Sequence, residues 1–249
     1  MINLIFEEYS DYYDLIYKDK DYKKEFDYIN RLLSRFNINN GSILEFGSGT
    51  GKHGCLLAKA GYIVHGIDLS AKMVARAQQC KGFSCEQGDI TSINLGKHYD
   101  LILSLFHVIN YQVKNQHLQA VFANASKHLN SGGLFIFDFW YSPAVYHKKP
   151  QIKVKRVKNN KIEITRIAEP EFYPNENKVN INYTFFIKNL TTGFIKTLKE
   201  VHQIRHLNLL EIDILCDIHG FKIINSEEFI TGKVLSEETW GACVVLKKI

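Results

Sequence analysis

A glycine-rich turn between a short apolar strand and a helix constrains this chain more than any other feature. Residues 42–46 have the pattern of a buried strand, and the turn Gly47-Ser48-Gly49-Thr50-Gly51 leads directly into a helical pattern over residues 52–60. Glycines let the backbone turn sharply and pass close to a ligand. The free N–H groups of the first helical turn point at whatever lies above such a loop. The segment therefore predicts a strand–loop–helix unit that holds a ligand.

Two carboxylates follow at the ends of the next predicted strands. Residues 63–67 predict a strand that ends at Asp68, 17 residues after Gly51 (68 − 51), where a carboxylate can accept hydrogen bonds from both hydroxyls of a ribose. At the following strand–loop junction, Gln87-Gly88-Asp89-Ile90, Asp89 could accept from the exocyclic amine of adenine while Ile90 packs against the ring. We therefore expect a nucleoside to lie across these strand ends.

Two other interpretations of the glycine-rich turn, a dinucleotide site and a turn with only a structural role, predict different residues around it. A dinucleotide site has the spacing G-x-G-x-x-G, whereas this chain has G-x-G-x-G with Lys52 in place of the third glycine. The acidic Glu45 before the turn is also foreign to that fingerprint. A turn with only a structural role would not require carboxylates at the ends of the neighbouring strands. The combination favours a nucleoside site that is not a dinucleotide site.

Strands and helices alternate through the first part of the chain. Strands are predicted over residues 42–46, 63–67, 99–105 and 134–139, and helices over residues 52–60, 71–80 and 115–129. This alternation is typical of a parallel sheet with helices on both faces. Residues 1–35 are rich in tyrosine and are predicted to form a helical lid. The fold class is therefore α/β, with a Rossmann-like sheet.

The pattern changes after Pro143. Residues 153–157, 161–167, 177–187 and 194–206 alternate apolar and polar side chains, as antiparallel strands do. A helix over residues 207–219, closed by Gly220, and strands over residues 221–228 and 240–246 return to the main sheet. We expect one domain over residues 1–249, made of the lid (1–35), a cofactor-binding core (36–143), an inserted antiparallel β layer (144–206) and the C-terminal end of the core (207–249).

Composition excludes several classes of protein. With 45% hydrophobic and 23% charged residues, the chain has the balance of an ordinary globular protein. It has no run of about 18 apolar residues that could span a membrane, and its N-terminus lacks the basic start of a signal peptide. The five cysteines are scattered without a C-x-x-C pair, which predicts neither a zinc site nor a redox dithiol. We expect a cytoplasmic protein with reduced cysteines and no metal.

The turn and the two carboxylates resemble the class I methyltransferase family. The family's first motif resembles Glu45-x-Gly47-x-Gly49-x-Gly51, its second Gly66-Ile67-Asp68-Leu69-Ser70, and its third Gly88-Asp89-Ile90. The resemblance spans about residues 42–140 and implies S-adenosylmethionine as cofactor and S-adenosylhomocysteine as product. We expect cofactor contacts from Tyr22, Glu45, Gly47, Gly49, Gly51, Asp68, Leu69, Asp89, Ile90 and Leu105.

A narrower resemblance covers nearly the whole chain and is to bacterial sugar methyltransferases, in particular the N,N-dimethyltransferases of nucleotide-linked amino sugars. It rests on Tyr13-Asp14-Leu15-Ile16-Tyr17, Gly49-Thr50-Gly51-Lys52-His53, Ser104-Leu105-Phe106 through Tyr111, and Trp140-Tyr141-Ser142-Pro143. It implies a small-molecule acceptor, an amino or hydroxyl group of a nucleotide-linked sugar, and by analogy a homodimer with the inserted layer at or near the interface. The chain departs from the amino-sugar enzymes at His107 and Asn110, where those enzymes tend to have small residues, so nitrogen and oxygen both stay open as the methylated atom.

The loop after the strand at residues 99–105 carries the candidate acceptor site. His107, Asn110 and Tyr111 can form hydrogen bonds in a segment that is otherwise apolar, at the end of the sheet where open α/β sheets bind ligands. A sugar hydroxyl usually needs a base beside it, whereas an amine can attack once it has lost its proton. His107 is the candidate base, with Tyr111 as the second candidate catalytic residue and Asn110 as a substrate contact.

Aromatic side chains at the same edge are further candidates for the acceptor site. Tyr13 lies in the predicted lid, and Trp140 and Tyr141 follow the strand at residues 134–139. Aromatic rings there suit stacking against a sugar or a base. The alternative for each of them is packing alone, and His53 and His65 are expected to be structural.

Two other functions remain open. A tRNA or rRNA methyltransferase would use the basic stretch at residues 148–161, KKPQIKVKRVKNNK, which is otherwise a solvated strand face or a surface that meets a phosphate-bearing substrate. A nucleic-acid methyltransferase is disfavoured by the segment Ser104-Leu105-Phe106-His107. This segment lacks the Asn/Asp-Pro-Pro-aromatic motif of enzymes that methylate exocyclic base amines. It also lacks a cysteine for covalent attack on cytosine. The second alternative is a protein that senses S-adenosylmethionine without turnover. The polar acceptor loop and the aromatic pair argue against a sensor, because they are features of a substrate site.

Overall fold

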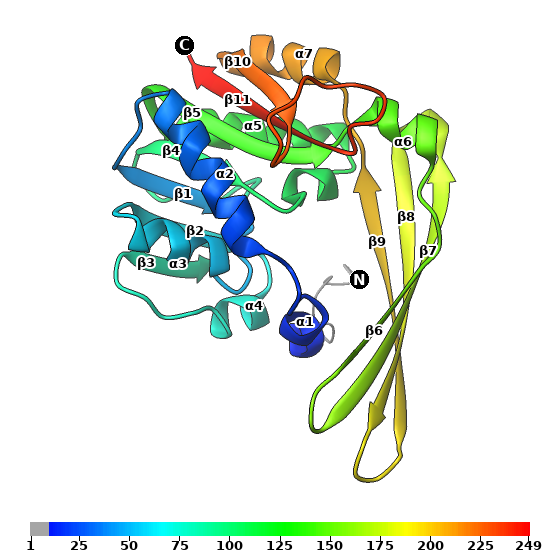
Figure 1. Ribbon diagram of the computed structural model, residues 1–249. Coiled ribbons are helices and arrows are strands. Elements are labelled where there is room, and N and C mark those ends of the chain that lie inside the picture. The colour runs from blue at the N-terminus through cyan, green and yellow to red at the C-terminus, as the bar shows by residue number, and fades with distance from the viewer. Residues whose placement is uncertain (1–9) are drawn as a thin grey trace.

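A seven-stranded sheet with helices on both faces forms the body of the molecule, and a four-stranded antiparallel sheet projects beside it (Figure 1). The computed structural model describes residues 10–249. The helices of the body are α1 (Ser10–Ile16), α2 (Tyr22–Arg35), α3 (Lys52–Lys59), α4 (Ala71–Ala75), α5 (Asn115–His128) and α7 (Leu209–His219). Its strands are β1 (Ser42–Phe46), β2 (Ile63–Asp68), β3 (Phe83–Gln87), β4 (Tyr99–Ser104), β5 (Leu129–Trp140), β10 (Phe221–Glu228) and β11 (Gly241–Lys248). The projecting sheet follows α6 (Ser142–Lys148) and consists of β6 (Lys153–Lys158), β7 (Ile162–Tyr173), β8 (Lys178–Asn189) and β9 (Ile195–Arg205).

The strand order β10-β11-β5-β4-β1-β2-β3 creates a crevice at the middle of the seven-stranded sheet. β1 to β5 pair in parallel, and β11 joins β5 and β10 in antiparallel pairs. The chain builds outward from β1 to β3 and then crosses to β4 on the other side of β1. The loops after β1 and β4 therefore leave the sheet in opposite directions, and ligands of open α/β sheets bind between such loops. The predicted α/β fold class is confirmed.

Apolar side chains close both faces of this sheet. On one face, α2 and α3 contribute Tyr28, Ile29, Leu32, Leu33 and Leu57. On the other face, α5 and α7 contribute Leu118, Val121, Phe122, Ala125, Ile212, Leu215 and Cys216. The helices bury one stripe each, as amphipathic surface helices do, and within residues 10–249 none of them is long and apolar enough to cross a membrane. Because both faces are covered, only the strand ends stay open for a ligand.

The four-stranded sheet is the predicted antiparallel layer, with strands paired in the order β6-β7-β8-β9. Its inner face buries Val157, Ile164, Phe185 and Ile187 against α1. One element was missed: the layer begins with α6, a helix with Pro143 in its first turn. Proline is favoured at that position because its missing N–H would have no partner there. The same proline therefore starts a helix at the point where the sequence pattern suggested only a boundary.

Helix α4 is shorter than predicted and ends at Ala75, where the helical pattern continued to residue 80. Ser70 caps its start by accepting from the N–H of Met73 at 3.3 Å. Beyond the helix, the N–H of Gln78 donates to the carbonyl of Thr50 at 3.0 Å. A continued helix would direct that N–H to residue 74 instead. The contact with the glycine-rich turn thus replaces the last helical turns.

The predicted lid is a pair of helices tied by ion pairs to the core helix α3 and to the four-stranded sheet. α1 lies between the core and the four-stranded sheet (Figure 1), and residues 1–9 of the predicted lid lie outside the described residues. Asp14 of α1 pairs with Lys52 of the core at 2.9 Å. Asp19, in the link to α2, lies 3.9 Å from Lys155 of β6. The lid therefore bridges the two layers.

Two of the cysteines are paired, which the sequence did not predict. Cys55 of α3 and Cys80, after α4, form a disulfide with their Cα atoms 5.9 Å apart, whereas Cys85, Cys216 and Cys243 are free. The prediction that the chain has only reduced cysteines is wrong for this pair. A separation of 25 residues carries no pairing signal. The pairing depends on how α3 packs against the segment that follows α4.

Candidate functional site

The glycine-rich turn lies at the end of β1 and is bent by left-handed residues. Gly47, Gly49 and Gly51 have φ angles of 74°, 55° and 72°, a region that glycine enters without a steric penalty. A Cβ at Gly47 would lie 2.4 Å from Val108, so the loops after β1 and β4 pass in contact. A Cβ at Gly49 would meet no atom within 4 Å, so the backbone there borders open space.

Asp68 ends β2 beside this turn, and its carboxylate is fixed by two backbone groups. Its Oδ2 accepts from the N–H of Gly49 at 2.8 Å and its Oδ1 from the N–H of Ser70 at 2.9 Å. Burial raises the pKa of Asp68, and the two hydrogen bonds act against this rise. A carboxylate has about four acceptor positions, so capacity for ribose hydroxyls remains. Leu69 next to it is 52% exposed and gives the cavity an apolar surface for a base.

Asp89 and Ile90 lie at the end of β3, as the sequence predicted. The Oδ1 of Asp89 accepts from the N–H of Thr91 at 2.8 Å and from its hydroxyl at 2.7 Å. The carbonyl of Ile90 accepts from the side chain of Asn124 at 2.9 Å. These bonds hold both residues against the cavity, with the Asp89 carboxylate exposed and Ile90 buried. An adenine amine and ring would meet suitable partners there.

Glu45 is placed differently from the prediction. It is 2% exposed and lies beneath the turn, outside the cavity lining. A Cβ at Gly54 would come within 2.7 Å of its Oε2, so the first turn of α3 packs directly on the carboxyl group. Burial, and then the nearby Asp68, raise the pKa of Glu45 to about 8. The predicted direct contact between Glu45 and the cofactor is therefore corrected to support of the turn from below.

The raised pKa of Glu45 predicts a specific dependence of stability on pH. The folded protein keeps the Glu45 proton up to about pH 8, whereas the unfolded chain loses it near pH 4.3. The free energy of unfolding from this group therefore falls as pH rises between these values. Glu45→Gln removes the titration, so its melting temperature relative to wild type should rise from pH 5 to pH 8.5. Parallel melting curves that keep a constant difference across this range would contradict the assignment.

A cavity of about 1160 Å³ lies between the strand ends, the lid and the inner face of the four-stranded sheet. Single-ligand pockets are usually about 300–1000 Å³, so this cavity has room for a cofactor and an acceptor together. The predicted site residues that line it are Tyr13, Tyr22, Gly47, Gly49, Asp68, Leu69, Asp89, Ile90, Leu105, His107, Tyr111 and Trp140. The predicted site residues outside its lining are Glu45, Gly51, Asn110 and Tyr141. The tertiary structure thus brings most of the predicted residues to one cavity.

His107 is held by Asp138, a carboxylate on β5 that the sequence did not reveal as functional. The Nδ1 of His107 lies 2.8 Å from Asp138 Oδ2, and the backbone N–H of His107 donates to Oδ1 at 3.1 Å. Asp138 has no exposed surface. Burial raises its pKa, but the contacts with His107 outweigh burial and hold the pKa below its ordinary value. With Nδ1 occupied by this carboxylate, Nε2 is the ring nitrogen that can serve an acceptor.

The backbone around His107 is strained. Phe106 and His107 have φ angles of 67° and 62°, a left-handed conformation that is uncommon for residues other than glycine. Each such residue costs about 1–3 kcal/mol and persists only where the surroundings enforce it. The Nζ of Lys20 lies 3.9 Å from the centre of the Phe106 ring, so the lid packs directly on this loop.

Asn110 and Tyr111, in the 3₁₀ turn Val108–Tyr111, have different environments. The side-chain amide of Asn110 donates to the carbonyl of Arg205 and accepts from the N–H of Trp140 at 3.2 Å. Asn110 is fully buried and lies outside the cavity lining, so the substrate contact predicted for it is corrected: it joins the loop to β5 and β9. Tyr111 borders the cavity, and its hydroxyl lies 2.9 Å from the Nδ1 of His202.

Only one of the two aromatic residues predicted to contact the substrate at the end of β5 borders the cavity. Trp140 borders the cavity, with its ring centre 6.3 Å from that of His107 and 5.2 Å from that of Trp240. Tyr141 instead packs against Phe139, and its N–H donates to the carbonyl of Trp240 at 3.0 Å. Neighbouring side chains of a strand point to opposite faces, so one of the two had to leave the site. The substrate contact predicted for Tyr141 is corrected to packing.

An ionic cluster ties the predicted lid to the side of the cavity that the glycine-rich turn forms. Glu25 of α2 lies 2.6 Å from the Nε2 of His53 and 2.5 Å from the Nζ of Lys20. The Lys20 ammonium lies 4.4 Å from the centre of the Tyr22 ring. Tyr22 and His53 both border the cavity. His53 thus has the expected structural role, as a partner of the lid, and His65 is bound to Tyr99 and Glu86 away from the site.

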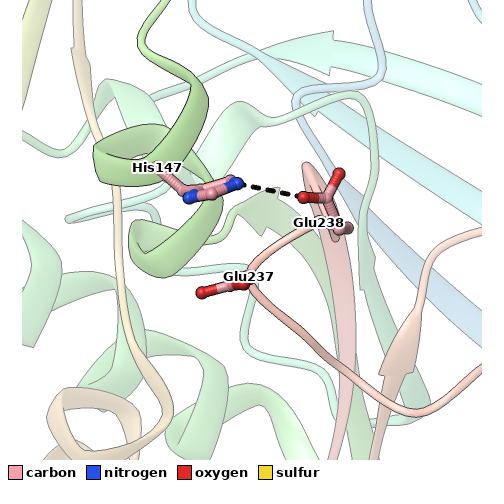
Figure 2. A group of neighbouring side chains, drawn as sticks. All are labelled: His147, Glu237 and Glu238. Atoms are coloured by element: carbon pink, nitrogen blue, oxygen red, sulfur yellow. Dashed lines mark ion pairs between the residues drawn. The ribbon is translucent and has the colours of Figure 1, made fainter.

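Among residues 10–249, a cluster of possible metal ligands lies outside this cavity. His147 on α6 faces Glu238 at 3.0 Å, and Glu237 lies beside them (Figure 2). All three side chains are exposed. The ammonium of Lys148 also contacts Glu238 and supplies a positive charge to the cluster. We assign no metal to it.

Several residues of the cavity have no signal in the sequence. Arg166, Tyr183 and His202 line the cavity and are ordinary members of antiparallel strands, and Asp138, buried behind His107, is one acidic residue within an apolar strand. Asp138 meets His107 because β5 lies beside β4 in the seven-stranded sheet, whereas only the docking of the four-stranded sheet against the strand ends brings the other three to the same cavity. The alternation of inward residues on β7, β8 and β9 could have grouped these three, but it could not have placed them beside the cofactor turn.

Comparison with known proteins agrees with this geometry. Residues 43–133 match the family model of a methyltransferase domain. Over 180 residues the chain is 24% identical to dTDP-3-amino-3,4,6-trideoxy-alpha-D-glucopyranose N,N-dimethyltransferase of Streptomyces venezuelae, covering 71% of this chain and 76% of the relative.

Solved structures share the whole fold. An S-adenosylmethionine-dependent methyltransferase from Clostridium acetobutylicum superposes with a TM-score of 0.80 at 23% identity, over 95% of this chain and 96% of its own. The amino pentose methyltransferase CalS10 from Micromonospora echinaspora, solved with S-adenosylmethionine bound, has a TM-score of 0.77 at 19% identity over 100% of both chains. The matched domain, the shared fold and a turn that fits a nucleoside lead to one conclusion: the chain is an S-adenosylmethionine-dependent methyltransferase with the class I fold.

Proposed function

We propose that the enzyme transfers the methyl group of S-adenosylmethionine to an amino or hydroxyl group of a nucleotide-linked sugar. The observation that carries the proposal is His107, whose Nδ1 is held by the buried Asp138 in a cavity large enough for both reactants. The relative from Streptomyces venezuelae, named for a dTDP-linked amino sugar, supports the substrate class.

The side chains of the cavity suit this transfer. The sulfonium of the cofactor supplies an activated methyl group, so the protein has to align the reactants and exclude water. Asp68 and Asp89 would hold the nucleoside of the cofactor. His107, kept in the Nδ1–H form by Asp138, would take the proton that leaves the acceptor at Nε2. A hydroxyl acceptor would depend on this step more than an amine that arrives unprotonated.

Positive charge on the outer part of the cavity supports an anionic acceptor. Lys149, Lys153 and Arg166 border the cavity on the side of the four-stranded sheet. Lys148 also borders it, but its ammonium contacts Glu238. A diphosphate would find several cationic partners there, since lysine and arginine both bind phosphate oxygens.

The arrangement of the basic stretch speaks against a nucleic-acid substrate. In β6, Lys153 and Lys155 pair with Ala168 and Arg166 on the inner face, whereas Arg156 and Lys158 alternate with them and point outward. The positive charge is therefore divided between two faces of the sheet. A nucleic-acid surface would need a continuous basic patch on one face.

An activity screen tests the proposal. Purified enzyme and S-adenosylmethionine would be incubated with a panel of dTDP-linked amino sugars and neutral sugars, and separately with tRNA and rRNA, while S-adenosylhomocysteine formation is measured. We expect turnover with at least one nucleotide-linked sugar. Turnover only with RNA would replace the proposal by the nucleic-acid alternative, and cofactor binding without any turnover would favour a sensor.

We also propose that the enzyme is a homodimer that pairs through the outer face of the four-stranded sheet. Val154, Phe186 and Val201 are exposed on this face, at 55%, 39% and 49%. A second copy of the chain would bury them. Light scattering at micromolar concentration should give twice the chain mass of 28.7 kDa. A monomer in that measurement would remove this part of the proposal.

A further inference from the structure

A lysine of the predicted lid is largely enclosed by the protein, beside the loop that carries His107. Lys20 follows α1 and lies outside the cavity lining. Its side chain is 9% exposed, and its ammonium pairs with Glu25 of α2 at 2.5 Å. The same ammonium lies 3.9 Å from the centre of the Phe106 ring and 4.4 Å from the centre of the Tyr22 ring. One enclosed cation therefore contacts both the lid and the loop after β4.

The ring of Phe106 neighbours the lid as well as the ring of His107. It meets Tyr17, directly after α1, edge to face with ring centres 5.3 Å apart, and it packs on the apolar cluster between α1 and the four-stranded sheet. Its centre lies 5.8 Å from the centre of the His107 ring, with 33° between the two planes. The imidazole of His107 thus has Phe106 as a neighbour, while Asp138 holds its Nδ1.

The backbone at Phe106 and His107 makes these ring contacts consequential. Both residues have left-handed φ angles, 67° and 62°, which residues other than glycine keep only where their surroundings enforce them. Rotation of Phe106 to an ordinary φ would move its ring and redirect the next residue. Contacts that fix the Phe106 ring therefore also fix the direction in which the His107 side chain leaves the loop.

We propose that Lys20 is a positioning residue for methyl transfer: its ammonium holds the ring of Phe106, and through this ring the imidazole of His107, in the orientation that the acceptor needs. The proposal rests on the proposed function, because it takes His107 as the base of that reaction. A cation over an aromatic ring is attracted by the negative face of the ring, and the attraction is stronger where water is excluded. Arginine can supply the same attraction, whereas an uncharged side chain of similar length cannot.

Kinetics of the full-length enzyme test this role with the nucleotide-linked sugar that the activity screen identifies. Lys20→Met should lower kcat about tenfold, the order expected for one enclosed cation–ring contact, with the acceptor KM and the affinity for S-adenosylhomocysteine nearly unchanged. Phe106→Leu should lower kcat by a similar factor, because it removes the ring and leaves the Lys20–Glu25 pair. Lys20→Arg should recover most of the activity. Lys18→Met is the matched control, since Lys18 is an exposed lysine of the same link and lies outside the cavity lining.

A double-mutant cycle and a spectrum separate positioning from a general loss of stability. If Lys20 acts through Phe106, the enzyme with both Lys20→Met and Phe106→Leu should lose no more kcat than either single variant. The imidazole of His107 can be followed without any acceptor in proton–carbon spectra, where its Cε1 signal is the one absent from His107→Gln. We expect Lys20→Met to shift or broaden this signal, and Lys20→Arg and Lys18→Met to leave it near its wild-type position.

The results distinguish this proposal from the function on which it rests. A wild-type kcat in Lys20→Met, fully additive losses in the double variant, or a His107 signal that does not respond would overturn the proposal. Weaker binding of S-adenosylhomocysteine with kcat preserved would also overturn it, because Lys20 would then act through Tyr22 on the cofactor side. Absence of turnover with every nucleotide-linked sugar would refute the proposed function, whereas a shifted His107 signal in Lys20→Met would still show that Lys20 orients the imidazole.

Discussion

Replacement of His107 by alanine should lower the rate of methyl transfer to a hydroxyl acceptor by about 10²–10⁴, the usual contribution of a positioned base. The expectation follows from the Nδ1 contact with Asp138 at 2.8 Å, which directs the second ring nitrogen to the acceptor. Affinity for S-adenosylhomocysteine should stay within about twofold, because the glycine-rich turn and Asp68 do not depend on the imidazole. For an amine acceptor the loss should be smaller, since the amine can arrive without its proton.

The measurement is kcat with the true acceptor, beside calorimetry with S-adenosylhomocysteine. His65→Ala is the matched control, because His65 has its own hydrogen-bonded partners outside the cavity. Asp138→Asn should reproduce much of the effect, with a loss of about 10², because an amide can donate to Nδ1 and move the ring hydrogen to the nitrogen that should act as base. Wild-type turnover in His107→Ala and Asp138→Asn together would mean that this loop is packing only.

Replacement of Asp68 by alanine should weaken cofactor binding by a comparable factor. Each hydrogen bond from a ribose hydroxyl to a carboxylate is worth about 1.5–3 kcal/mol, so the loss of two corresponds to roughly 10²–10⁴ in affinity. The N–H groups of Gly49 and Ser70 also lose their acceptor, which loosens the turn. Asp68→Asn keeps the shape and should lose less.

Calorimetry with S-adenosylhomocysteine measures this effect. Asp100→Ala is the matched control: its Oδ2 accepts from the N–H and the hydroxyl of Ser42 at 2.9 Å and 2.8 Å, and it lies outside the cavity. The control should destabilise the fold without a loss of cofactor affinity. Equal affinities for wild type and Asp68→Ala would place the ribose elsewhere, and binding of NAD instead of S-adenosylhomocysteine would refute the cofactor site as a whole.

The sequence alone determined the core fold and brought the glycine-rich turn and two carboxylates to one side of the cavity. Local rules are sufficient there: apolar strands alternate with helices, and Gly47, Gly49 and Gly51 bend a turn that side chains would obstruct. Asp68 and Asp89 follow strands that must lie side by side in a parallel sheet, so their positions in the chain fix their positions in space. The observed bounds of an element differ from the predicted bounds where a tertiary hydrogen bond replaces a helical one. After α4, for example, the N–H of Gln78 donates to the carbonyl of Thr50 in the glycine-rich turn.

Only the tertiary structure decided the acceptor side. Asp138 reaches His107 from another strand, and His202 reaches Tyr111 from a separate sheet, across 31 and 91 positions of the chain. The first contact depends on which strands become neighbours in the seven-stranded sheet and the second on how the two sheets dock, and no periodicity in a single strand encodes either. The same holds for Asn110, Tyr141 and the Cys55–Cys80 disulfide: the sequence gives the chemical capacity of each side chain, but burial and partners determine how that capacity is used. The proposed cofactor site could be predicted from local patterns because consecutive strand–loop units build most of it, whereas the proposed acceptor site is assembled from elements that meet only in the folded protein.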